Sequence, residues 1–119
     1  MYTYYFEKLT VWQNARNATK DIYLLTRKFP SEEKFGLVSQ LRRAMASVTA
    51  NIAEGMSRLS TKEKKRILNI SYSSAIEVIN FLILCLDLNL ITEEEYLDLS
   101  EKLECITNQL HGLQKNMKE

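Results

Sequence analysis

The stretch that decides the fold is residues 37–60, LVSQLRRAMASVTANIAEGMSRLS, in which two kinds of side chain recur at regular spacing. An apolar row repeats every three or four residues: Leu37, Leu41, Ala44, Val48 and Ile52. A second row, which we call the polar stripe, repeats at the same spacing: Gln40, Arg43, Ser47, Asn51, Glu54 and Arg58. Residues three and four apart share one side of an α-helix, so the segment is predicted to be a helix with adjoining apolar and polar faces.

The composition extends this helical prediction to the whole chain. The 119 residues are 45% hydrophobic and 26% charged, as in an ordinary globular domain, and include only three glycines and one proline. A sandwich or barrel of short strands would need many more turn residues. We therefore expect long helices in a single domain over residues 1–119, which is large enough to bury its own core.

Start and stop signals divide the chain into helices. Pro30 ends the first, because the residue before a proline is pushed out of the helical region. Ser60 and Thr92 each begin a capping-box sequence, and Gly55 suits a helix C-terminus. These signals predict four helices, over residues 6–28, 32–56, 60–88 and from 92 onward. Since the connections are short, the fold class is all-α, an antiparallel up-down-up-down four-helix bundle.

Residues 76–90 are apolar on nearly every side of the predicted third helix. One interpretation is a surface helix with an excess of apolar residues. The other, which we favour, is that the extra row packs against a second chain, because large apolar patches usually mark interfaces. The predicted interface residues are Ile76, Ile79, Ile83 and Leu86.

The cysteines and the most apolar segment point to a cytoplasmic protein. Cys85 and Cys105 are too few for a disulfide framework or metal site and fall in apolar rows, so both are expected to be buried free thiols. The N-terminus lacks the features of a signal peptide. Residues 75–91 are shorter than a membrane span and contain acidic and amide side chains, so no membrane association is expected.

No catalytic set of residues can be recognised. His111 has no neighbouring nucleophile or ligand at a defined spacing, and the chain lacks a glycine-rich phosphate loop and metal-binding spacings. Glu54 and Glu77 are expected to form salt bridges with arginines of the polar stripe rather than to act in acid–base chemistry. We therefore predict a non-enzymatic protein with no cofactor and no metal.

The charge is unevenly distributed although the net charge is only +1. Residues 1–74 contain 13 Lys and Arg against 6 Asp and Glu, whereas residues 75–119 contain 3 against 9. Such asymmetry indicates either a polyanionic partner or electrostatic pairing between chains. The predicted phosphate contacts are Arg42, Arg58, Lys62, Lys65 and Arg66.

These features resemble a family of small bacterial helical proteins. The residues that carry the resemblance include Leu9, Val11-Trp12, Phe29-Pro30, Gly36-Leu37 and, most densely, the segment QLRRAMASVTANIAEG over residues 40–55. The chain is similar to the proteins encoded in intervening sequences of 23S ribosomal RNA genes, and to the related accessory proteins of diversity-generating retroelements. The resemblance implies a cytoplasmic bundle that assembles into a pentameric ring, with RNA or DNA and a reverse transcriptase as partners.

Two roles remain for the polar stripe. Gln40, Arg43, Ser47, Asn51 and Glu54 match the family's motif, and they could form a structural or interfacial hydrogen-bond network. Alternatively they could contact nucleic acid, although Glu54 would repel phosphate. We favour the network. The predicted function is therefore a ring-forming bundle that binds RNA through a basic surface, and the alternative is a protein-interaction scaffold that binds no nucleic acid.

Overall fold

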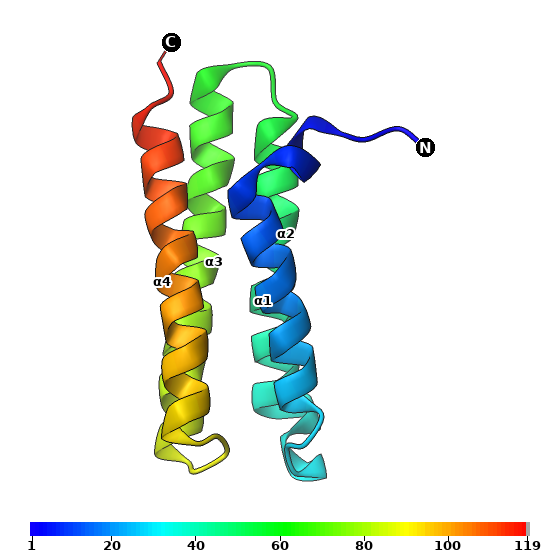
Figure 1. The fold of residues 1–119 in the computed structure, drawn as a ribbon, viewed down its shortest axis with the longest axis vertical. Coiled ribbons are helices and arrows are strands. Elements are labelled where there is room, and N and C mark those ends of the chain that lie inside the picture. Colours follow the sequence, from blue (N-terminus) through cyan, green and yellow to red (C-terminus); the bar gives the residue numbers. More distant parts are fainter. Residues whose placement is uncertain (119) are drawn as a thin grey trace.

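The computed structural model describes residues 1–118, and its architecture is a bundle of four helices (Figure 1). The helices are α1 (Thr10–Thr26), α2 (Ser39–Met56), α3 (Thr61–Asp87) and α4 (Glu93–Lys115). Each packs antiparallel against the next, and α4 also packs against α1. Both chain termini and the α2–α3 turn lie at one end of the bundle, which we call the termini end. The predicted fold class is confirmed.

The core is built from the apolar rows that the sequence predicts. In α4, apolar residues three and four apart are buried at Leu99, Leu103, Ile106 and Leu110, and Tyr96, Leu113 and Met117 pack against the same core. The rows of α1 and α2 are buried in the same way, and Val11 and Met45 join them. The spacing of three and four residues works because it keeps each row on one side of its helix.

Two predicted helix starts are wrong. Residues Tyr5–Lys8 form a separate 3-10 turn, η1, and α1 begins only after an extended Leu9. Residues Ser31–Glu33 (η2) and Lys34–Val38 (η3) are a 3-10 turn and a π-helical turn. The backbone leaves helical geometry at Gly36 (φ −107°, ψ −111°), where glycine disfavours a continuous helix, so α2 starts at Ser39.

The predicted end signals also differ in detail. Thr92 forms a complete capping box with Glu95. Ser60 accepts a hydrogen bond from the Glu63 amide, which is one half of a box. Gly55 does not cap α2 but lies inside it, buried against α3, where an added Cβ would lie 3.2 Å from Leu68 Cγ. Its role is therefore the close approach of two helices.

The cysteines differ from each other. Cys85 is buried, and burial together with the charge of Glu33 raises the pKa of its thiol to about 11. The prediction of a buried thiol is wrong for Cys105, which is exposed. Cys105 lies between Leu103 and Ile106 in sequence but on the outer side of α4.

Helix α3 is long enough and apolar enough to cross a membrane, judged by length and hydropathy alone. In the bundle this helix packs against both α2 and α4 and supplies core residues such as Val78 and Leu82. A central helix of a folded bundle has the same composition, so the feature is weak evidence for a membrane.

Candidate functional site

The exposed side of α3 has two parts. Near the termini end it carries polar and basic side chains: Lys62, Arg66, Asn69 and Ser73 are exposed, and Lys65 is partly exposed. Beyond residue 75 it carries large apolar side chains, which we call the apolar face: Ile76, Ile83, Leu84 and Leu88. One helix therefore presents a charged surface and an apolar surface along its length.

The predicted phosphate contacts are only partly brought together. Lys62, Lys65 and Arg66 lie in the first turns of α3, and Arg58 lies in the turn just before it, all at the termini end. We call these four residues the basic cluster. Arg42 lies about 24 Å from Arg58 along α2, from the rise per residue.

Arg42 is committed to contacts within the bundle. Its Nε donates a hydrogen bond to Thr26 Oγ1 at 2.9 Å, and its Nη2 donates to the Tyr23 carbonyl at 3.3 Å. The guanidinium also lies 4.4 Å from the centre of the Tyr23 ring. These contacts fasten α2 to α1, so the structure separates Arg42 from the basic cluster.

Within the basic cluster, the arginines have carboxylate partners. Arg58 pairs with Glu54 at 2.9 Å and Arg66 with Glu63 at 3.0 Å. The hydrogen bond and the charge attraction between Arg66 and Glu63 lower the pKa of Glu63 and raise the pKa of Arg66. Lys62 and Lys65 form no ion pair with any carboxylate in residues 1–118.

The C-terminal end of α4 adds cations that the sequence prediction missed. Thr61 Oγ1 donates to the Lys118 carbonyl at 3.2 Å, which holds the end of the chain beside the start of α3. Lys115 and His111 line a groove together with Lys65. These cations were overlooked because residues 75–119 are acidic on average. The antiparallel pairing of the third and fourth helices predicts that the end of the fourth lies beside the start of the third.

Among the lysines near the start of α3, Lys62 lies in the first turn, where the helix dipole disfavours a cation. The N-terminus of a helix carries partial positive charge, and each cation there costs about 0.3–1 kcal/mol when exposed. Lys64 has a structural reason to be there, since its Nζ donates to the Met56 carbonyl at 3.1 Å and caps the end of α2. Lys62 and Lys65 have no such contact within residues 1–118, so their charge is available to an anionic ligand.

The polar stripe lies along the seam between α2 and α3. Ser47 and Ser74 hydroxyls are 2.9 Å apart, and Asn51 Nδ2 donates to the Ser47 carbonyl and hydroxyl at 2.8 and 3.0 Å. Toward the other end of the bundle, Arg43 donates to Gln40 at 2.9 Å and lies 4.0 Å from Glu77. Both predicted pairings of Glu54 and Glu77 with arginines are present. These bonds form separate groups along the seam, and because they occupy the polar groups of the stripe they favour a structural role over a phosphate surface.

The predicted interface residues differ in exposure. Ile76 and Ile83 are 45% and 42% exposed, as an interface would require. Ile79 and Leu86 are partly buried and pack against the core of their own chain. The apolar face therefore includes Leu84 and Leu88 in their place.

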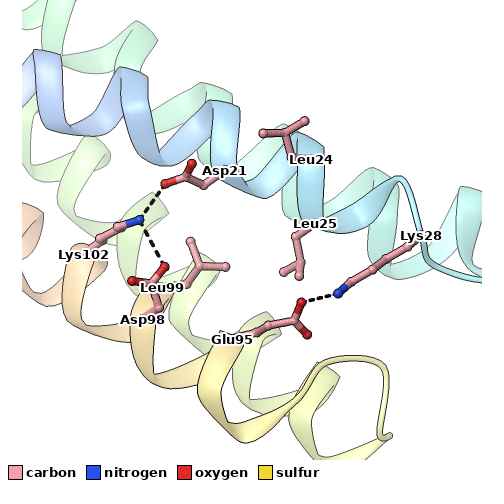
Figure 2. Close-up of a pocket in the computed structure, with 8 residues that line it drawn as sticks. All are labelled: Asp21, Leu24, Leu25, Lys28, Glu95, Asp98, Leu99 and Lys102. Carbon is pink, nitrogen blue, oxygen red and sulfur yellow. Dashed lines mark hydrogen bonds and ion pairs between the residues drawn. The ribbon is translucent and has the colours of Figure 1, made fainter.

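A second groove lies between α1 and α4 and has a volume of about 330 Å³ (Figure 2). Its charges are already paired: Lys102 Nζ lies 2.9 Å from Asp21 and 3.1 Å from Asp98, and Lys28 pairs with Glu95. The hydrogen bonds from Lys102 to the two aspartates raise the pKa of Lys102. The hydrogen bond from Lys28 to Glu95 lowers the pKa of Glu95. These pairs join the two helices and leave little charge for a ligand.

No arrangement for metal binding is present in the described part of the chain, where no three His, Cys, Asp or Glu side chains converge. His111 is exposed and lies in a groove with two lysines rather than beside a nucleophile or a carboxylate. The geometry supports binding of an anion more than it supports catalysis.

Comparison with known proteins identifies similar chains. The family model described as 23S rRNA-intervening sequence protein matches residues 7–112. A crystal structure of a protein of unknown function from Bacteroides thetaiotaomicron, described as from the S23 ribosomal protein family, superposes with a TM-score of 0.81. Its sequence is 24% identical, and the match covers 90% of this chain and 100% of that one, which shows a shared fold. No curated protein matches.

Proposed function

Because the chain belongs to the 23S rRNA-intervening sequence protein family, we propose that it is a non-enzymatic, self-associating bundle that binds RNA through its basic cluster. The observation that carries the proposal is the convergence of cations at the termini end. Lys65 of α3 lines a groove with Lys115 of α4, and Lys118, beyond the end of α4, accepts a hydrogen bond from Thr61, the neighbour of Lys62. No carboxylate in residues 1–118 pairs with any of these four lysines. The protein is proposed to be soluble and cytoplasmic.

Nucleic acid suits this surface better than other anions. Neutralising phosphates releases counterions, and each contact adds affinity without needing a shaped pocket. The names of the family and of the structural relative refer to ribosomal RNA and to a ribosomal protein, which makes RNA the first ligand to test. Repetition of a modest cluster around a ring would increase its effective affinity further.

Self-association is supported by the apolar face and the adjoining polar stripe. The apolar face lies on α3, and the polar stripe lies on α2 and reaches α3 through Ser74 and Glu77. We propose a ring of five subunits, the number implied by the family resemblance. The alternative scaffold function would use the same apolar face to hold a polypeptide partner, such as a reverse transcriptase.

The test replaces Lys62, Lys65 and Arg66 together with Glu and measures binding of a fluorescent single-stranded RNA by anisotropy. The wild-type chain is expected to bind at low salt and to lose affinity steeply as salt rises, whereas the variant is expected not to bind. Circular dichroism should show equal helicity, since none of the three side chains is buried.

The matched control replaces Lys20, Arg27 and Lys34 with Glu, which changes the net charge equally but leaves the termini end intact. This control is expected to keep most of the RNA affinity. Equal loss in both variants would show that net charge, and not the basic cluster, governs binding. Absence of binding by the wild-type chain at low salt would leave the scaffold as the better proposal.

A further inference from the structure

A groove of about 450 Å³ lies between α3 and α4 at the termini end. Six side chains line it: Lys65, Asn69, Tyr72, His111, Gln114 and Lys115. The volume falls in the range of small-molecule sites in proteins. The lining residues of α3 are four and three apart, and both Gln114 and Lys115 lie three or four residues after His111 on α4, so the groove is formed by two facing helix surfaces.

The polar side chains of the groove are uncommitted. None of the six takes part in a side-chain hydrogen bond or ion pair with another of residues 1–118, unlike the residues of the α1–α4 groove. No carboxylate lines the groove, and three of its six side chains are Lys or His. Its unused donors therefore favour an anionic ligand with further hydrogen-bonding groups.

The groove has two chemically different ends. Lys115 is the last residue of α4 and Lys65 lies about one turn into α3, so both ammonium groups belong to the outer end. Tyr72 lies about two turns further along α3, and its ring is partly buried against the core. Asn69, His111 and Gln114 lie between or beside them. Cations at one end and an aromatic ring at the other suit a ligand with a phosphate and a planar ring.

We propose that this groove binds one unpaired nucleotide of a single-stranded RNA, with the phosphate between Lys65 and Lys115 and the base against Tyr72. This rests on the proposed function, that the chain binds RNA. Bases of single strands stack on aromatic side chains, and amide side chains both donate to and accept from base edges. Within a duplex the base faces are covered, so Tyr72 can act only on an unpaired base.

The groove also explains how a small basic cluster could select among RNAs. Phosphate contacts by Lys62 and Lys65 hold any strand, because they read no base. The aromatic side chain of Tyr72 accepts only an unstacked base, so it adds a preference for single-stranded RNA over duplex RNA. The two effects are separable, since Lys62 lies outside the groove and Tyr72 carries no charge.

The experiment compares a single-stranded RNA of about ten nucleotides with a duplex of the same length, within the site sizes of single-strand-binding proteins. Tyr72→Leu removes the ring but keeps an apolar side chain against the core, and Tyr72→Phe keeps the ring. We expect Tyr72→Leu to weaken single-strand binding about tenfold, leaving duplex binding unchanged, and Tyr72→Phe to bind like the wild type.

The phosphate end is tested with Lys65→Gln and Lys115→Gln together, which should weaken binding and flatten its salt dependence. The matched control, Arg27→Gln with Lys34→Gln, removes the same charge outside the groove and should do neither. If Tyr72→Leu loses helicity, His111→Gln and photo-crosslinking of thiouridine-labelled RNA to the wild-type chain take its place. Crosslinks are expected at Tyr72 or His111.

The outcomes distinguish the two proposals. Unchanged single-strand affinity in Tyr72→Leu, or crosslinks confined to other surfaces, overturns the nucleotide groove while the basic cluster can still bind RNA. Loss of binding on substitution of Lys62, Lys65 and Arg66, with no effect at Tyr72, likewise overturns the groove alone. A wild-type chain that binds neither RNA at low salt overturns both proposals.

Discussion

The apolar face makes a quantitative prediction about assembly. Ile76 and Ile83 are 45% and 42% exposed in the single chain, so somewhat less than half of each side chain remains to be buried by a partner. Full burial of an isoleucine contributes about 1.5–3 kcal/mol, which leaves about 1 kcal/mol for each residue at an interface. Replacing both with Ser should therefore cost about 2 kcal/mol per subunit contact.

This loss corresponds to a roughly 30-fold weaker association at each contact. Sedimentation velocity over a wide concentration range should show the assembly dissociating at a correspondingly higher concentration in Ile76→Ser with Ile83→Ser. The isolated subunit should itself lose about 2–3 kcal/mol of unfolding free energy, because more than half of each side chain is buried within its own chain. Assembly is therefore compared at a temperature well below the Tm of the variant.

Leu97→Ser is the matched control, since Leu97 is 57% exposed on α4 and lies outside the apolar face. It should assemble like the wild type. A wild-type chain that sediments as a 13.9 kDa subunit at every concentration would refute this reasoning. The same holds if Leu97→Ser weakens assembly as much as the double substitution does.

Three further predictions concern single groups. At about pH 8 a maleimide should label the exposed Cys105 rapidly but spare the buried Cys85, whose thiol has a pKa of about 11. Mass spectrometry should therefore find one adduct on the folded chain and two after denaturation. Lys28 lowers the pKa of Glu95 in the folded state, so their pairing stabilises the fold at neutral pH and this stabilisation is lost on acidification. The difference in Tm between the wild type and Lys28→Gln should therefore shrink as the pH falls from about 6 to about 3. Thr92→Val should cost about 1 kcal/mol of unfolding free energy in denaturant titrations, whereas Thr92→Ser should retain the cap and the wild-type stability.

The helices were predictable because their signals are local. The spacing of apolar residues and the capping signal at Thr92 predict the four helices, since both depend on neighbours within one turn or two. The pairing of Glu54 with Arg58 was predictable for the same reason, since the two are four residues apart, whereas Glu77 meets Arg43 only across the seam between α2 and α3.

The candidate site was less predictable because it joins ends of helices that are distant in sequence. Arg42 and Arg58 belong to one basic segment of the chain, but the rise of α2 puts them far apart. Lys115 belongs to an acidic segment, but the antiparallel return of α4 puts it in a groove with Lys65. Average charge along the sequence describes neither arrangement.

By itself, the sequence determined that this chain forms four amphipathic helices in one bundle, because helix periodicity is encoded at every turn. Only the tertiary structure decided which side chains remain exposed at the surface. Leu88 and Cys105 lie in rows that look apolar, yet both are exposed, because burial depends on which neighbouring helix covers that side. The same dependence separated Arg42 from the basic cluster and placed Lys115 beside α3.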